Sequence, residues 1–153
     1  DEIAGHGGDR DLYEQAQLAE FVREIPPLAA RLMEQYWPGP LTIIMLARPE
    51  FAGAGGAATI GFRLPNHPVA QAFLRACRRP VVAPSANPSG EAPPTDAREV
   101  LASFAGRDGG VAFILDAGPT PLGRESTVVS VVGNRLQVLR EGAIAGNELR
   151  ALA

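Results

Sequence analysis

The sequence predicts an α/β fold, an open mixed sheet with flanking helices, and three observations support this. Apolar segments with strand character alternate with amphipathic segments of helical period. Two apolar segments near the end surround Gly133-Asn134, a dipeptide that favours a two-residue hairpin turn. With 153 residues and 46% hydrophobic side chains, the chain is long enough for one core but not comfortably for two. We therefore expect a single domain.

The first part of the chain predicts a polar end, two helices and a strand. Residues 1–10 are polar and glycine-rich without a period, so we expect them to be disordered or displaced and the domain to occupy 11–153. Helical spacing relates two sets of apolar residues: Leu12, Ala16, Ala19 and Val22, then Leu28, Leu32, Met33 and Tyr36. The second helix should end at Trp37 to Pro40, because prolines remove amide donors. The apolar run Leu41 to Leu46 is typical of a strand covered on both faces.

The strand predicted at Thr59 to Leu64 follows a Gly/Ala-rich loop, residues 52–58, and has an unusual alternation. Ile60, Phe62 and Leu64 share one face, whereas Thr59, Gly61 and Arg63 share the other. We interpret the first face as core and the second as the floor of a site.

The second part of the chain predicts further helices and strands. An amphipathic helix is expected over His67 to Cys77, on Val69, Phe73 and Cys77, and a short buried strand over Pro80 to Ala83. Thr95 or Asp96 can cap a helix that runs to about Phe104, with Glu99 placed for a capping box from Asp96. The remaining elements are a strand over Val111 to Leu115, the hairpin strands Thr127 to Val132 and Arg135 to Arg140, and a short helix from Gly146.

Polar side chains at three places have the character of ligand-binding groups. Arg63 has small neighbours on its face, which leaves room for a carboxylate or phosphate that its guanidinium could bind bidentately. Ser85 and Asn87 follow a buried strand, where open α/β sheets place ligands. Arg140 ends an apolar row and would need an anionic partner if that row faces inward. Arginines that simply reach solvent, and a turn in which Ser85 and Asn87 bond their own backbone, are equally ordinary alternatives.

Composition narrows the function classes. The net charge of −3 gives no general attraction to polyanions, and all 14 basic residues are arginine. The lone Cys77 excludes an internal disulfide, and the isolated His6 and His67 do not support a metal site or a Ser-His-Asp triad. No apolar run approaches a membrane span, so we expect a cytoplasmic protein without a membrane partner.

Taken together, five segments resemble the YrdC-type threonylcarbamoyl-AMP synthase family in order and spacing. The resemblance extends from about Asp11 to Ile144, and no single segment would be sufficient. The segments are Trp37 to Thr42, Arg63 to Pro68, Pro84 to Asn87 with Ser89-Gly90, Asp116 to Thr120 with Glu125 to Val129, and Leu139 to Ile144.

The resemblance implies a twisted YrdC-like sheet with a concave cavity and a nucleotidyltransferase that joins L-threonine, bicarbonate and ATP, with Mg²⁺, into threonylcarbamoyl-AMP and pyrophosphate. The product would pass to tRNA threonylcarbamoyl transferase proteins, and tRNA or double-stranded RNA is a further expected partner. By residue, it implies that Arg63, Ser85 and Ser126 bind threonine or its carbamoyl adduct. It likewise implies that Thr59, Asn87, Thr95 and Arg140 bind ATP.

The chain departs from the family pattern at its beginning. Family members carry a Lys-x-Arg segment that faces the triphosphate, and Asp1 to Arg10 offers no counterpart. We therefore expect an N-terminally incomplete domain with weak or absent activity of its own. Two alternatives stay open: a non-catalytic module that binds nucleotides or double-stranded RNA, and the carbamoyl-adenylate-forming domain of a carbamoyltransferase.

Overall fold

The computed structural model describes residues 6–51, 58–88, 91–106 and 111–153. Backbone contacts divide the chain into two compact units, Asp1–Ala83 with Arg124–Ala153, and Pro84–Gly123. The larger unit contains the sheet, and the smaller unit contains the helix α4 (Ala97–Phe104).

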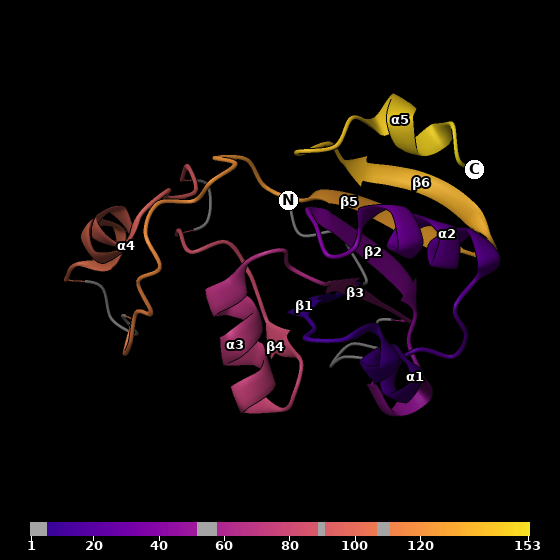
Figure 1. The fold of residues 1–153 in the computed structure, drawn as a ribbon, viewed down its shortest axis with the longest axis horizontal. Helices are drawn as coiled ribbons and strands as arrows, with labels where there is room; N and C mark the ends of the chain where they lie inside the picture. Colours follow the sequence, from indigo (N-terminus) through magenta and orange to yellow (C-terminus); the bar gives the residue numbers. More distant parts are fainter. Residues whose placement is uncertain (1–5, 52–57, 89–90, 107–110) are drawn as a thin grey trace. The chain divides into compact units, whose positions relative to one another are not determined.

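The described strands of the larger unit form one six-stranded sheet in the order β4-β1-β3-β2-β5-β6 (Figure 1). β1 pairs with β3, and β2 with β5, in parallel, whereas the other three neighbouring pairs are antiparallel. This arrangement confirms the predicted open mixed sheet. The strands are β1 (His6–Asp11), β2 (Leu41–Leu46), β3 (Thr59–Arg63), β4 (Val81–Val82), β5 (Thr127–Val132) and β6 (Arg135–Arg140).

Helices flank the sheet, and α2 (Pro27–Tyr36) begins and ends where the sequence predicts. The first position of a helix has no partner for an amide hydrogen, so proline, which has none, is well suited to begin α2. The amide of Leu28 donates to Asn134 Oδ1 in the hairpin turn at 2.9 Å. The Tyr36 hydroxyl donates to Glu148 of α5 (Gly146–Arg150) at 3.0 Å. These bonds join both ends of α2 to the C-terminal part of the chain.

The remaining helical segments are η1 (Gln15–Gln17), α1 (Leu18–Phe21), η2 (Pro49–Phe51) and α3 (Pro68–Cys77). None of the described helices is long and apolar enough to cross a membrane.

The hydrophobic core lies between one face of the sheet and α1, α2 and α5. Ile60 and Phe62 are fully buried in this core, as their alternation predicts. Complete burial of such a side chain contributes about 1.5–3 kcal/mol. The other strand residues of the core cluster are Leu41, Ile43, Met45, Val129 and Val131.

The opposite face of the sheet carries the polar side chains. Asp11 pairs with Arg63, and Thr42 lies one position beyond the Ile43–Phe62 pair, at the level of Arg63. Thr42 in turn pairs with Val128 of β5, and Val128 pairs with Arg140 of β6. Because directly paired residues point to the same side of a sheet, this row crosses the five strands from β1 to β6 on one face.

The structure corrects the expectation of a frayed end from His6 onward, because residues 6–10 form β1 with Asp11. β1 lies between β3 and β4, so its backbone groups find partners on both sides. Strand pairing satisfies backbone donors and acceptors whatever the side-chain pattern, which is why a polar segment can occupy this position. Residues 1–5 lie outside the described part of the chain.

The first predicted helix is shorter than its spacing suggests. Leu12 and Val22 are buried as expected, but Ala16 and Ala19 are exposed, and only η1 and the four-residue α1 form between them. The Gln17 side chain accepts from the amides of Tyr13 and Glu14 in a capping box. Helix initiation is therefore delayed past Leu12.

The strand predicted over Pro80 to Ala83 forms as β4, but its predicted burial and the predicted apolar face of α3 were wrong. Leu74 is the buried residue of α3, whereas Val69 and Phe73 are 36% and 43% exposed and Cys77 is also exposed. β4 is an edge strand in which Val82 is 58% exposed. An edge strand has only one neighbour, so apolar residues there need not be covered.

In the smaller unit, α4 is predicted well and the strand over Val111 to Leu115 is not. Asp96 caps α4 by accepting from the amides of Arg98 and Glu99, while the Glu99 carboxylate accepts from Thr95 rather than from Asp96. Residues 111–115 form no strand, and Phe113 is 75% exposed. Within the described part of the smaller unit these residues have no partner strand, and an apolar run alone does not satisfy its backbone groups.

Candidate active site

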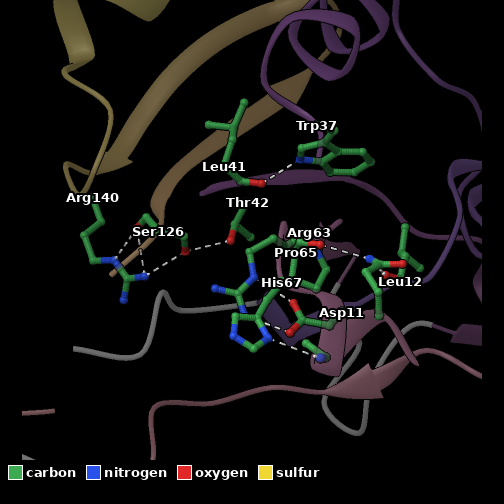
Figure 2. Close-up of polar contacts among 12 residues, drawn as sticks. Asp11, Leu12, Trp37, Leu41, Thr42, Arg63, Pro65, His67, Ser126 and Arg140 are labelled. Atoms are coloured by element: carbon green, nitrogen blue, oxygen red, sulfur yellow. Dashed lines mark hydrogen bonds and ion pairs between the residues drawn. The ribbon is translucent and has the colours of Figure 1, made fainter. Parts of the chain in front are cut away.

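Arg63 forms a bidentate ion pair with Asp11 across the β1–β3 pair (Figure 2). Its Nε donates to Asp11 Oδ1 at 2.8 Å, and its Nη2 donates to Oδ2 at 2.7 Å. The two side chains are 31% and 15% exposed, respectively. Arg63 therefore binds a carboxylate bidentately, as the sequence predicts, but that carboxylate is the side chain of Asp11.

The electrostatic surroundings of Arg63 stabilise its charge. Burial by itself lowers the pKa of Arg63, but the hydrogen bonds and charge of Asp11, together with the charge of Asp9, raise the pKa above its ordinary value. The guanidinium is thus permanently charged and suited to an anionic partner.

Sequence reasoning missed Asp11 because residues up to Arg10 were interpreted as a polar end. The sequence does contain one indication of this site, because Asp9 and Asp11 are two positions apart and would share one face of a strand. Their register opposite Gly61 and Arg63 depends on long-range pairing, which no local pattern predicts.

Arg140 and Ser126, two more of the predicted site residues, lie together at the β5–β6 end of the same face. Arg140 Nη2 donates to the Ser126 carbonyl at 3.0 Å and to Ser126 Oγ at 3.3 Å, and Nε donates to that carbonyl at 3.3 Å. Its Nη1 lies 3.2 Å from Glu125 Oε2. Ser126 Oγ in turn shares a hydrogen bond of 2.9 Å with Thr42 Oγ1 (Figure 2). The result is a continuous polar network from β6 to β2.

A β-bulge in β6 explains why Arg140 belongs to this face. The strand alternation places Arg140 with Leu136 and Val138, which pack against the core. However, Val138 pairs with Val129 and Arg140 pairs with Val128, so one extra residue of β6 interrupts the alternation. The bulge therefore turns Arg140 away from the core, to the face that carries Thr42 and Arg63.

Thr127 holds the loop that precedes α5 against this network. Its fully buried hydroxyl donates to the Ile144 carbonyl at 2.6 Å and accepts from the amides of Gly142 and Ile144 at 2.9 Å each. Gly142 lies so close to the Glu125–Ser126 backbone that an added Cβ would lie 2.6 Å from the Ser126 carbonyl oxygen. Neither role was assigned from the sequence, although both residues are in the resembling segments.

The remaining predicted site residues lie in two places. Thr59 begins β3 on the face of Arg63 and is half-buried. Ser85, Asn87 and Thr95 belong to the smaller unit. Ser85 is exposed, and Thr95 is bonded to Glu99 at the start of α4. Ser89 and Gly90 fall outside the described residues.

Asn87 organises the loop after β4. Its Nδ2 donates to the carbonyls of Pro88 and Glu91 at 3.0 and 2.9 Å. Its Oδ1 is buried without a hydrogen-bond partner in the described part of the chain. A buried amide oxygen of this kind is suited to accept from a ligand donor.

The larger unit thus presents one sheet face with two arginines, a buried pair of hydroxyls and a carboxylate. Guanidinium groups bind carboxylate and phosphate oxygens, and hydroxyls both donate and accept. Among the described residues, no group of three or more His, Cys, Asp or Glu side chains could hold a metal ion. His67 instead caps α3 by accepting from the Ala70 amide at 3.4 Å.

Comparison with solved structures supports the same fold. The P. abyssi Sua5 protein complexed with L-threonine superposes with a TM-score of 0.85 at 33% identity, over 97% of this chain and 44% of that one. The E. coli YciO protein superposes with a TM-score of 0.76 at 26% identity, over 90% of this chain and 66% of that one.

Sequence comparison agrees with the structural comparison. A threonylcarbamoyl-AMP synthase of Bacillus subtilis is 38% identical over 140 residues, which are 90% of this chain and 40% of that protein. The chain therefore spans less than half the length of this relative. The family model for Sua5, YciO and YrdC proteins, described as "Telomere recombination", matches residues 12–142. Because this match covers most of the chain, the chain belongs to the Sua5/YciO/YrdC family.

Proposed function

We propose that this chain is the substrate-binding part of a threonylcarbamoyl-AMP synthase, a nucleotidyltransferase. In the proposed reaction the amine of L-threonine combines with bicarbonate to give a carbamate and water. A carbamate oxygen then attacks the α-phosphorus of ATP, and pyrophosphate leaves. The observation that carries the proposal is the close superposition on a Sua5 protein that has L-threonine bound, together with the polar sheet face.

Arg63 and Ser126 are the proposed threonine-binding residues of the larger unit, with Ser85 of the smaller unit. The Arg63 guanidinium already holds a carboxylate in bidentate geometry, so it can hold the threonine carboxylate in the same way. Ser126 Oγ belongs to a polarised chain of groups from Arg140 to Thr42 and can donate to, or accept from, the carbamoyl group.

Arg140, Thr59, Asn87 and Thr95 are the proposed ATP-binding residues. Arg140 is half-exposed, and its bonds to Ser126 go to neutral oxygens, so it can turn toward a phosphate at modest cost. The buried Asn87 Oδ1 would accept from an adenine amino group or a ribose hydroxyl. Mg²⁺ would enter as the complex with ATP, since the described residues provide no metal-binding cluster.

Catalysis in such a site would depend on positioning and on stabilisation of phosphate charge. Neither step of the reaction needs a protein nucleophile, because the substrate supplies it. The product would pass to tRNA-threonylcarbamoyl transferase proteins, with tRNA as a further proposed partner.

The direct test measures pyrophosphate release from ATP, and the mass of the nucleotide product, with threonine and bicarbonate each omitted in turn. We expect release that depends on both. Arg140→Gln should lower the rate about tenfold or more, because one charged hydrogen-bond donor is lost. The matched control is Arg135→Gln, an exposed arginine on the same strand, which should leave the rate unchanged.

Calorimetric titrations with ATP and with threonine accompany the assay. ATP binding without pyrophosphate release would contradict the synthase proposal and favour a nucleotide-binding module. Release that requires carbamoyl phosphate instead of threonine would favour the carbamoyl-adenylate alternative.

A further inference from the structure

A polar hollow lies on the side of the sheet that faces α1, away from the candidate active site. Arg10 of β1 pairs with Phe62, whose side chain is in the core, so Arg10 points to the opposite face from Asp11. Arg10 lines a hollow of about 460 Å³ with Arg78, Arg79, Tyr13, Phe21 and Glu20. All of these residues belong to the larger unit.

The lining of this arginine hollow is strongly cationic, with three arginines against Glu20. Within the described part of the chain, the side chains of Arg78 and Arg79 form no hydrogen bond or ion pair. Burial lowers the pKa of Arg10, which means that its charge is partly desolvated. A small anion with several oxygens matches such converging guanidinium groups.

The backbone of Arg78 provides an independent indication. Arg78 is the C-cap of α3 and has φ 55° and ψ 22°, the left-handed conformation that favours glycine. A role in compensating the negative helix end does not require this residue, because Arg75 already occupies the last turn. The left-handed conformation costs a residue with a Cβ about 1–2 kcal/mol, so glycine would be the more stable residue at this C-cap.

The aromatic residues that line the arginine hollow, Tyr13 and Phe21, indicate which kind of anion it could bind. The Phe21 ring packs against Phe51 and Phe62, with centroids 4.7 and 5.8 Å away, so it forms a fixed apolar wall. Tyr13 adds an aromatic ring with a hydroxyl. An organic phosphate could place its phosphate among the arginines and its ring against this wall.

We propose that the arginine hollow binds a phosphate monoester that carries an aromatic group, such as a nucleoside monophosphate. This site is separate from the proposed synthase site, because the two lie on opposite faces of the sheet and share no residue. The proposal therefore does not depend on the proposed reaction.

The test is a titration of the ¹⁵N-labelled chain with AMP, adenosine and inorganic phosphate, followed through the amide resonances of Tyr13, Arg78 and Arg79. We expect AMP to shift these resonances more strongly than inorganic phosphate, with an affinity that decreases as salt increases. Adenosine should leave them unchanged. Shifts confined to Ser126 and Arg140 would report the other face and would contradict the proposal.

Arg78→Gly removes one guanidinium and also relieves the left-handed strain, so we expect about fivefold weaker AMP binding with an unchanged or higher melting temperature. Arg79→Gln is a second variant with the same expected loss of affinity, and Arg31→Gln, an exposed arginine of α2, is the charge-matched control. Unchanged AMP affinity in both hollow variants, an equal loss in Arg31→Gln, or no shifts at about 10 mM AMP would overturn the proposal.

Discussion

Arg63 and Arg140 occupy the same face of one sheet, but their surroundings differ. Arg63 is one-third exposed and meets the Asp11 carboxylate in two short, charge-assisted bonds. Arg140 is 41% exposed and is bonded mainly to the carbonyl and hydroxyl of Ser126, with Glu125 at 3.2 Å. Arg63 is thus held by a partly buried carboxylate, whereas Arg140 is held by the dipoles of Ser126 and by a more exposed ion pair with Glu125.

This difference indicates how each arginine could accept a ligand. A ligand carboxylate that binds the Nε–Nη2 side of Arg63 must replace Asp11, which makes binding there an exchange of one anion for another. A phosphate can reach Arg140 at the expense of neutral hydrogen bonds and of a solvent-exposed ion pair with Glu125. The same face therefore combines an arginine that already holds a carboxylate in two short bonds with an arginine that is more exposed and more loosely bonded.

The largest expected effect on stability comes from Thr127→Val, which acts on the Arg140 side alone. Loss of the hydroxyl leaves the amides of Gly142 and Ile144 and the carbonyl of Ile144 without their partner, at a cost of about 3 kcal/mol. Urea unfolding measures this change. Thr127→Ser keeps the hydroxyl and should stay close to the parent chain, and equal losses in both variants would exclude the hydrogen bonds as the cause.

Arg63→Gln should have the next largest effect, because it leaves the Asp11 carboxylate, which is 15% exposed, without its partner. Removing one partner of a fully buried pair costs about 3–5 kcal/mol, and partial exposure reduces the expected loss to about 2 kcal/mol. Urea unfolding again measures the loss. If Arg135→Gln, at an exposed position, destabilises the chain as much, the ion pair is not the reason.

Asp11→Asn tests the exchange of anions directly. The amide keeps one acceptor for Arg63 but removes the charge, so we expect a loss of about 1 kcal/mol in stability. With the competing carboxylate gone, threonine should bind about threefold to tenfold more tightly in calorimetry. Weaker threonine binding would mean that Asp11 supports the ligand position instead of occupying it.

Arg140→Gln should have the smallest effect on stability, less than about 1 kcal/mol, because the ion pair with Glu125 is well exposed to solvent. Its effect on ATP binding should be larger, about tenfold weaker, if Arg140 is the phosphate position. A large loss of stability with unchanged ATP binding would reverse the contrast between the two arginines.

Local sequence patterns predicted the parts of the fold whose cause is local. β2 and the hairpin strands match their predicted bounds, and α2 ends at Tyr36, just before the predicted stop at Trp37 to Pro40. Gly133 and Asn134 adopt the positive φ values, both 58°, that the turn requires. In these segments apolar period and turn chemistry favour the same structure.

The segments that differ from prediction depend on distant partners. β1 is polar and pairs between β3 and β4, while the apolar residues 111–115 find no partner within the described part of their own unit. The arrangement of the site likewise depends on residues that are distant in the sequence. Arg63 was identified from its small neighbours, but Asp11 opposite it, Thr42 beside Ser126 and the bulge that turns Arg140 follow from strand register.

The most direct measurement of the central claim is a titration of the ¹⁵N-labelled chain with L-threonine. The account predicts shifts of the amide resonances of Thr42, Arg63 and Ser126, which disappear in Arg63→Gln and strengthen in Asp11→Asn, while those of Arg10 and Arg78 stay unchanged. Absence of shifts at Thr42, Arg63 and Ser126, or the same shifts in Arg63→Gln, would contradict a threonine site on this face of the sheet.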